Sequence, residues 1–162
     1  MYVKRTLREK YSIFKGKHFP YITARKKHLR HSATIGIGGN VSDVRRRFEH
    51  LFFYLKRERR IQILQTALIL KNPPFGFLDQ DDFFNSIMII KTDMQAHTFL
   101  AYLMRVEKKF GRKRSFANAP RTLDLDMIFF DKQVINTNKL TLPHPHWSKR
   151  ESVVFPLASM QA

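Results

Sequence analysis

Cysteine is absent from the 162 residues, so the chain has no disulfides, no thiolate metal ligands and no cysteine nucleophile. Acidic residues are scarce, with 13 Asp and Glu against 30 Lys and Arg. No apolar run approaches the roughly 20 residues that span a bilayer, and the first residues lead into no apolar core, so we expect neither a membrane span nor a secretory signal. Hydrophobic residues make up 43% of the chain, which excludes disorder throughout.

The formal net charge of +17 favours polyanionic partners such as nucleic acid, an anionic membrane or nucleotide phosphate. Residues 1–32 carry 10 Lys and Arg with one acidic residue, so a fifth of the chain holds about half of the charge. We therefore divide the chain into a basic N-terminal extension, residues 1–32, and a body of residues 33–162 that forms the functional domain.

The extension lacks a sustained apolar period, and we expect it to be loose or draped over the body, dispensable for chemistry. Two alternatives stay open. An organelle transit peptide would also be Arg-rich and poor in acid. Packing of Phe14, Phe19 and Tyr21 onto the body would instead make the extension a structural brace.

The body alternates strand and helix patterns. Apolar residues at i, i+3, i+4 and i+7 predict a helical stripe of Phe48, Leu51, Phe52 and Leu55. The expected elements, in order, are a strand at 33–37, a helix capped by Ser42, a strand at 61–70, a strand at 83–91, a helix after a Thr92–Gln95 capping box, and a strand at 123–130. This order predicts an α+β, ferredoxin-like βαββαβ fold, with a four-stranded antiparallel sheet, both helices on one face, and loops and ligands on the other.

The strongest local motif is the segment 120–126, Pro-Arg-Thr-Leu-Asp-Leu-Asp. Side chains alternate along a strand, so Asp124 and Asp126 point to the same face, roughly 7 Å apart. Two carboxylates among apolar neighbours repel each other unless a cation compensates, and Mg²⁺ takes one or two carboxylates together with substrate phosphates. A solvated strand face with two inert carboxylates is the alternative.

Two further features could hold a substrate. Arg112, Arg114 and Arg121 lie close to the Asp pair in sequence, and guanidinium groups suit phosphate oxygens, although a solvated basic loop is the alternative. No Gly-x-x-x-x-Gly-Lys-Ser/Thr motif occurs, which excludes a P-loop enzyme.

The paired prolines of 72–76 stiffen a loop that can present main-chain groups to a flat polar heterocycle, with Asn85 as hydrogen-bond partner and Phe83 or Phe75 for stacking. An ordinary hairpin loop is the alternative here.

These motifs together resemble the 6-hydroxymethyl-7,8-dihydropterin pyrophosphokinase family, over about residues 33–157. The segment 120–126 matches the specific signature of that family. The other matches follow in the family's order: Gly38-Gly39-Asn40, the loop 72–76, Phe83-x-Asn85, Glu107 with Arg112 and Arg114, and Leu142-Pro143-His144 with Arg150.

The resemblance implies an enzyme of tetrahydrofolate biosynthesis that transfers pyrophosphate from ATP to the pterin hydroxymethyl group, giving AMP and the pterin diphosphate, with two Mg²⁺ ions. It assigns both metals to Asp124 and Asp126, and catalysis to these two residues with Arg112 and Arg114 on a mobile loop. The pterin would contact Asn72, Pro73, Phe75, Phe83, Asn85 and Asp124. ATP would contact Glu107, Arg114, Arg121, Met127, Thr141, His144 and Arg150.

The chain also departs from the family pattern. Asn118-Ala119 replace a Trp-Gly before the signature, with Phe116 as a substitute for the tryptophan, and Ser152 stands where a second stacking aromatic is found, with Trp147 as a replacement. The basic extension is extra. We expect a cytoplasmic monomer with no nucleic-acid or membrane partner. The rival function is a ferredoxin-like RNA-binding module, which the charge suits but whose Lys/Arg-Gly-Phe-type signature is absent.

Overall fold

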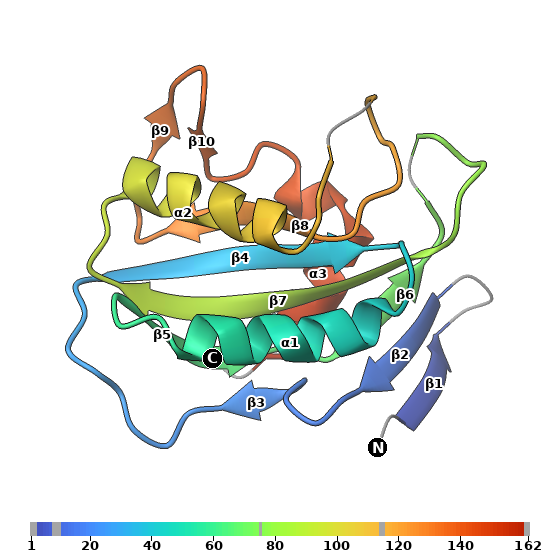
Figure 1. Ribbon diagram of the computed structural model, residues 1–162, viewed down its shortest axis with the longest axis horizontal. Coiled ribbons are helices and arrows are strands. Elements are labelled where there is room, and N and C mark those ends of the chain that lie inside the picture. Colours follow the sequence, from blue (N-terminus) through green and yellow to red (C-terminus); the bar gives the residue numbers. More distant parts are fainter. Residues whose placement is uncertain (1–2, 8–10, 75, 114–115, 161–162) are drawn as a thin grey trace.

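The computed structural model describes residues 3–7, 11–74, 76–113 and 116–160, which form an α+β fold with one large sheet and three α-helices (Figure 1). All strand pairs of this sheet are antiparallel. Its strands lie in the order β1-β2-β6-β7-β4-β8, and β5 pairs with both β3 and β7. In chain order the strands are β1 (Val3–Leu7), β2 (Tyr11–Lys15), β3 (Tyr21–Ile22), β4 (His31–Gly39), β5 (Ile61–Thr66), β6 (Ile69–Asn72), β7 (Phe83–Thr92) and β8 (Asp124–Phe130).

The sheet is larger than the four strands expected from the sequence. The predicted strand at 61–70 is two strands, because β5 and β6 both pair with the long β7 but separate at Ala67. Opposite this break the Ser86 hydroxyl donates to the carbonyl oxygens of Ala67 and Leu68, at 3.1 and 3.0 Å. A side chain thus satisfies backbone groups that a continuous ladder would have paired.

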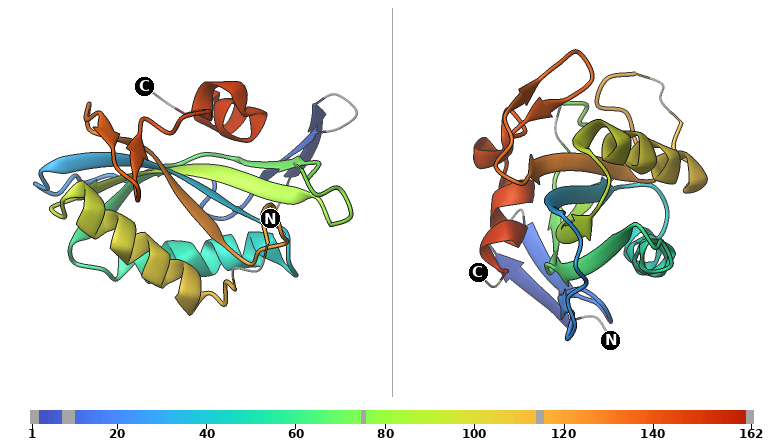
Figure 2. Two further views of the ribbon diagram at one scale, coloured as in Figure 1. Left: turned by 90° about the horizontal axis from the view of Figure 1, so that it is seen from above. Right: turned by 90° about the vertical axis from the view of Figure 1, so that its left-hand side faces the viewer.

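Helices α1 (Val44–Lys56) and α2 (Ala96–Lys109) cover one face of the sheet, as predicted (Figure 2). The predicted stripe on α1 is confirmed, since all four of its members are buried. The predicted caps are wrong. Asp43, not Ser42, accepts the cap hydrogen bond from the Arg46 N–H, at 3.1 Å. Helix α2 begins after Gln95, and the Thr92 hydroxyl instead donates to the Arg60 carbonyl at 2.9 Å and accepts from the Met94 N–H at 3.1 Å.

A third helix, α3 (Glu151–Ala158), lies on the opposite face of the sheet, so the prediction that this face carries only loops is wrong (Figure 2). Its Val153 packs with Ala67, Ile87 and Ile128 in a small second core. A one-turn 3₁₀ helix, η1 (Trp147–Lys149), precedes it, and a short hairpin of β9 (Ile135–Asn136) and β10 (Thr141–Leu142) follows β8. Across the described ranges, no helix is long and apolar enough to cross a membrane.

Residues 11–22 of the N-terminal extension are packed onto the body. Strand β2 extends the sheet by pairing with β6. The side chains of Phe14 and Phe19 are buried in the main core, where Phe19 lies 5.8 Å from the Phe48 ring. The division of the chain at residue 32 stays a prediction, but these residues are part of the sheet and of its core.

Candidate active site

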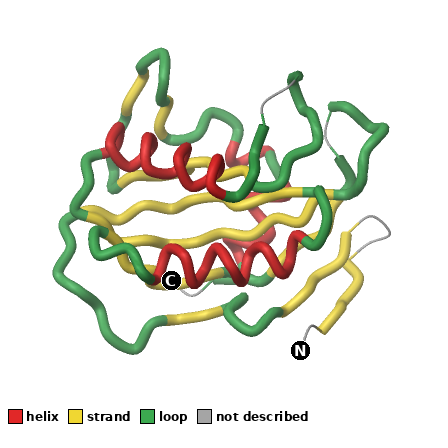
Figure 3. The backbone as a smooth tube through the Cα atoms, in the orientation of Figure 1, coloured by secondary structure: helices red, strands yellow, loops and turns green. Residues whose placement is uncertain are grey.

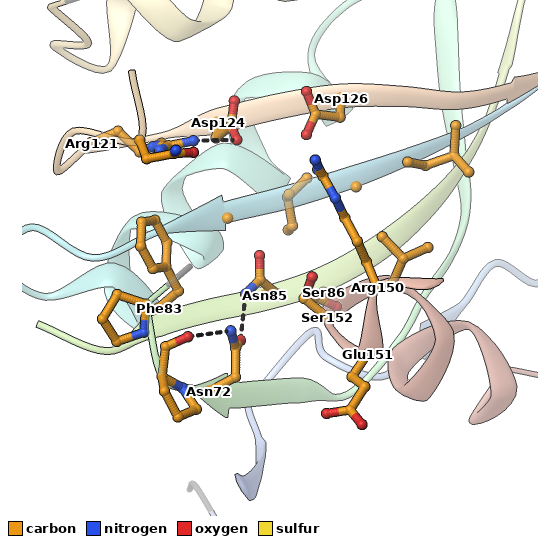
Figure 4. A pocket seen from close by; sticks show the side chains of 18 of the residues that line it. Asn72, Phe83, Asn85, Ser86, Arg121, Asp124, Asp126, Arg150, Glu151 and Ser152 are labelled. Carbon is orange, nitrogen blue, oxygen red and sulfur yellow. Dashed lines mark hydrogen bonds and ion pairs between the residues drawn. The ribbon is translucent and has the colours of Figure 1, made fainter. Parts of the chain in front are cut away.

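A pocket of about 390 Å³ lies on the sheet face that carries α3. Its floor is built from alternate residues of adjacent strands, including Gly38 of β4, Asn85 of β7 and Asp124 of β8. The start of α3 forms one wall, and the segments that precede β7 and β8 form the mouth (Figure 4). Strand alternation therefore gathers polar side chains here, while their sequence neighbours fill the core beneath α1 and α2.

The amide side chains at one end of the pocket form a short chain of hydrogen bonds. Asn85 donates from Nδ2 to Oδ1 of Asn72 at 2.6 Å, and Asn72 donates to the Pro73 carbonyl at 3.0 Å. Gly38 gives the Asn85 side chain its space, because a Cβ at position 38 would lie 2.5 Å from the Asn85 Oδ1. The amide oxygen and nitrogen are thus held in a fixed orientation, suited to a polar heterocycle.

Two carboxylates on β8 face the pocket, whereas Leu125 between them is buried in the core, as the strand pattern predicts. Asp124 is clamped by two arginines. Arg112 donates from Nη1 to its Oδ1 at 2.5 Å, and Arg121 donates from Nη1 to its Oδ2 at 3.2 Å. The Arg121 guanidinium also lies 5.1 Å from the centre of the Phe83 ring, a cation–π contact that orients it at the pocket edge.

Asp126 has a different environment from Asp124. Burial, together with the charges of Asp124 and Glu107, raises the pKa of the Asp126 carboxyl to about 7, although Arg150 and Arg112 oppose the increase. No hydrogen bond reaches its carboxylate from the described residues. Arg150 extends toward Asp126 from the start of α3 (Figure 4). A carboxylate with so little compensation favours a bound cation.

Glu107 anchors the arginine clamp from behind the pocket. Its buried Oε2 accepts hydrogen bonds from the Arg112 Nη1 at 2.7 Å and from the Leu125 N–H at 2.8 Å. Burial lowers the pKa of Arg112, but the charges of Asp124 and Glu107 outweigh it and place the pKa above its ordinary value. Arg112 therefore stays cationic and is held rigidly between α2 and β8.

The structure brings together most of the residues predicted to form the site. Those lining the pocket are Asn72, Pro73, Phe83, Asn85, Arg121, Asp124, Asp126 and Arg150. Arg112 and Glu107 lie directly behind them. Phe75 and Arg114 lie outside the described residues.

Three predicted ATP residues lie apart from the pocket lining. The Met127 side chain is in the core, on the opposite face of β8 from the two carboxylates. Thr141 is exposed on β10. His144 is half-buried, with its N–H bonded to the Ile128 carbonyl at 2.9 Å, and burial lowers its pKa, assisted by Arg150 and His146. Their roles stay predictions.

The two loops at the pocket mouth contact each other and rise from the same end of the sheet (Figure 3). Gln80 donates from Nε2 to the Asn118 carbonyl at 2.9 Å, which joins the segment before β7 to the segment before β8. Phe116, the expected substitute for a tryptophan, is exposed there and packs edge-on against Phe77, with 5.3 Å between the ring centres.

Sequence reasoning missed pocket residues from both ends of the chain. Three such residues line the pocket: Tyr11 of β2, Lys149 of η1 and Glu151 of α3. Trp147, the expected replacement aromatic, packs against Phe129 at 5.0 Å and is not among the described lining residues. The position of Tyr11 had no local signal, because only the pairing of β2 with β6 brings it to the pocket.

Comparison with known proteins identifies the relatives of the chain. A family model described as 7,8-dihydro-6-hydroxymethylpterin-pyrophosphokinase matches residues 34–162. A 2-amino-4-hydroxy-6-hydroxymethyldihydropteridine pyrophosphokinase of Helicobacter pylori is 36% identical, over 92% of this chain and 93% of its own. The protein of the same name from Campylobacter jejuni is 39% identical, over 88% of this chain and 91% of its own.

The match to the Helicobacter protein reaches into the N-terminal extension. Residues 33–162 are 130 of the 162 residues, about 80% of the chain, whereas the match covers 92% of it. The expectation that the extension is extra relative to the family is therefore wrong for this relative, which shares part of the segment that forms β2.

Proposed function

The chain belongs to the 7,8-dihydro-6-hydroxymethylpterin-pyrophosphokinase family, and from this premise we propose that the pocket beneath α3 is its active site. The enzyme transfers a pyrophosphoryl group from ATP to the hydroxymethyl group of 6-hydroxymethyl-7,8-dihydropterin in folate biosynthesis, giving AMP and the pterin diphosphate. The rival RNA-binding function has no support among the matches.

The main support for the proposed site is that one pocket is lined by two kinds of group: neutral amides at one end, and arginines with carboxylates at the other. Asn72 and Asn85, with their linked amides, lie at one end. Arg121 and Arg150, with the β8 carboxylates, lie at the other. A flat polar heterocycle and a triphosphate need these two environments side by side, because transfer requires the hydroxyl oxygen and the phosphorus to be held in line.

At the heterocycle end, we assign the pterin to Asn72, Pro73, Phe83 and Asn85, with Asp124 at its border. The fixed amides select the hydrogen-bonding edge of the ring, and Phe83 offers an aromatic face. Phe75 stays a predicted part of this subsite.

At the phosphate end, the arginines supply positive charge for the triphosphate. Arg121 and Arg150 face the pocket, and Arg112 is held behind Asp124 by Glu107. Preorganised cations stabilise the charge that develops during phosphoryl transfer without reorganising. Arg114 is proposed to close over the substrates and exclude water, which would compete with the pterin hydroxyl, whereas Arg112 acts from its fixed position between Glu107 and Asp124.

The residues at the pocket fit the two Mg²⁺ ions implied by the family resemblance. Asp124 and Asp126 present hard carboxylate oxygens on one face of β8. Burial and the charges of Asp124 and Glu107 raise the pKa of Asp126 despite Arg150 and Arg112, so a further cation would stabilise its charged form. Both Asp124 oxygens accept hydrogen bonds from arginines, so Asp124 would share its oxygens between a bound ion and Arg112 and Arg121. Bound Mg²⁺ supplies charge neutralisation for the phosphates of ATP.

We also assign the strands β4, β5, β7 and β8, with α1 and α2, to a ferredoxin-like core. They are adjacent in the order β5-β7-β4-β8, and each helix connects two of them. The monomeric state expected from the sequence stays a prediction.

The decisive test is a coupled assay for AMP release from ATP, with and without the hydroxymethyl pterin, in the presence of Mg²⁺. We expect AMP to form only when the pterin is present. Formation of ADP, or of AMP independently of the pterin, would contradict the proposed reaction.

A further inference from the structure

The pocket receives one aromatic side chain from the N-terminal extension. Among the described residues that line it, the aromatic ones are Phe83 of β7 and Tyr11 of β2. Ser152, the α3 residue on the same wall, is too small to cover a planar ring. The second aromatic surface of the pocket therefore comes from Tyr11, which lies 72 residues before Phe83 in the chain.

The position of Tyr11 follows from strand pairing. Strand β2 pairs antiparallel with β6, Ser12 opposite Lys71 and Ile13 opposite Leu70, so Tyr11 comes level with Asn72. Phe14 is buried in the core beneath α1, and strand alternation turns Tyr11 to the other face, where α3 and the pocket lie. The tyrosine thus borders the amide end of the pocket.

Helix α3 also holds the Tyr11 ring in place. The ring packs edge-on against Phe155 of α3, with 5.9 Å between the ring centres and 68° between the planes. The α3 helix is itself anchored to the sheet by Val153. A half-buried ring fixed between a strand and a helix loses little conformational entropy when a ligand contacts it.

We infer that Tyr11 is a substrate-binding residue whose ring contacts the planar pterin at the amide end of the pocket. This inference rests on the proposed function, because it takes the pterin as the occupant of that end. The sheet order β2-β6-β7-β4-β8 places the β8 carboxylates at the far side from Tyr11, so its contact is with the heterocycle and not with the triphosphate. The N-terminal extension then completes the active site.

The test compares Tyr11→Ala, Tyr11→Phe and the unchanged full-length protein. Dissociation constants are measured by calorimetry for a non-hydrolysable ATP analogue, and for the pterin in the presence of that analogue. An aromatic side chain that stacks on a planar base contributes strongly to its binding, so we expect Tyr11→Ala to weaken pterin binding about 5- to 150-fold. Tyr11→Phe keeps the ring and should bind normally, and analogue affinity should not change.

Ile13→Ala is the matched control, because Ile13 lies on the same strand but is not among the described pocket residues. It should leave pterin affinity unchanged. Unchanged pterin affinity in a folded Tyr11→Ala protein would overturn the inference, as would an equal loss of both affinities accompanied by a lower melting temperature. Failure of the unchanged protein to release AMP would contradict the proposed function itself, so the two failures are distinguishable.

Discussion

Arg112 bonds to Asp124 at 2.5 Å, so one of the two carboxylates on the pocket face of β8 already has a cationic partner in the ligand-free protein. The other, Asp126, has no such close partner among the described residues, and its pKa is raised to about 7 by burial, Asp124 and Glu107. Two residues that are equivalent in the sequence pattern are therefore unequal in the structure, and their substitution should have different consequences.

Asp126→Asn should separate activity from stability. The substitution removes a poorly compensated negative charge, so we expect the melting temperature of the ligand-free protein to stay equal or rise. Turnover should fall by at least about 100-fold, because the phosphate charge loses its proposed metal ligand. The measurements are thermal unfolding and the AMP assay with Mg²⁺.

Asp131→Asn serves as the matched control for that variant. It makes the same chemical change just after β8, where Asp131 bonds to the Ser32 N–H at 2.8 Å and not to the pocket. It should retain turnover. If Asp126→Asn also keeps most of its turnover, Asp126 is not a metal ligand.

Arg112→Ala should destabilise the protein, since it leaves the buried Glu107 without the guanidinium that bonds to its Oε2. Loss of a partner from a buried polar group costs about 1–3 kcal/mol. In the double variant Glu107→Gln/Arg112→Ala the buried charge is also gone, so the free energies of unfolding should be less than additive. Urea denaturation gives the free energy of unfolding of the unchanged protein, of Arg112→Ala, of Glu107→Gln and of the double variant. Strict additivity would show that the two residues do not act as a unit.

Gly38→Ala should damage pterin binding, because the added Cβ would lie 2.5 Å from the Asn85 Oδ1 and displace the amide from Asn72. Gly36→Ala is a close control on the same strand, where the Cβ meets Ile128 at an ordinary 3.6 Å. We expect a higher pterin dissociation constant for the first variant and little change for the second. Equal effects of the two would mean that the Asn85 orientation does not determine affinity.

Much of this site follows from the sequence, because it depends on local periodicity. Alternation alone places Asp124 and Asp126 on one face of β8, and the helical period identifies the buried stripe of α1. The contribution of Tyr11 does not follow, because its pocket contact depends on the pairing of β2 with β6, residues far apart in the chain. The α3 helix was also missed, since its short apolar segment contains Pro156 and shows no clear helical stripe.

The stability of the protein should depend on pH through Asp131. Partial burial acts to raise the pKa of Asp131, but hydrogen bonds from the Ser32 N–H and from His31 outweigh it, so the pKa lies below its ordinary value. A carboxyl whose folded pKa is depressed contributes stability above its unfolded pKa, and that contribution is lost as the pH falls through the folded pKa.

Asp131→Asn removes this contribution while suiting the backbone, which has a φ of 50° that asparagine tolerates. The variant should be less stable near pH 7, by under about 1 kcal/mol because the group is partly solvated. The difference should shrink as the pH falls below the ordinary range of aspartate. Urea denaturation at several pH values checks this, and a difference that grows toward acid would have the wrong sign.

Phe19→Ala tests whether the N-terminal extension braces the core. Phe19 is fully buried and packs against Phe48 and Phe52 of α1, at 5.8 and 6.5 Å between ring centres. Loss of a buried phenylalanine costs about 3–5 kcal/mol, from the transfer of the ring and the cavity it leaves. The free energy of unfolding in urea should fall by that amount, whereas Lys17→Ala, which changes an exposed residue two positions earlier, should leave it nearly unchanged.

Phe19→Ala and Tyr11→Ala should then give opposite results. Phe19 does not line the pocket, so pterin affinity should survive its substitution at temperatures where the protein remains folded. Tyr11 lines the pocket and should affect affinity more than stability. A loss below about 1 kcal/mol for Phe19→Ala would mean that the segment is only loosely attached, since a fully buried aromatic side chain is worth more than that. If Phe19→Ala instead lowers the free energy of unfolding by the expected amount and leaves pterin affinity unchanged, the extension has two separate roles. Phe19 then contributes to the core, and Tyr11 contacts the substrate.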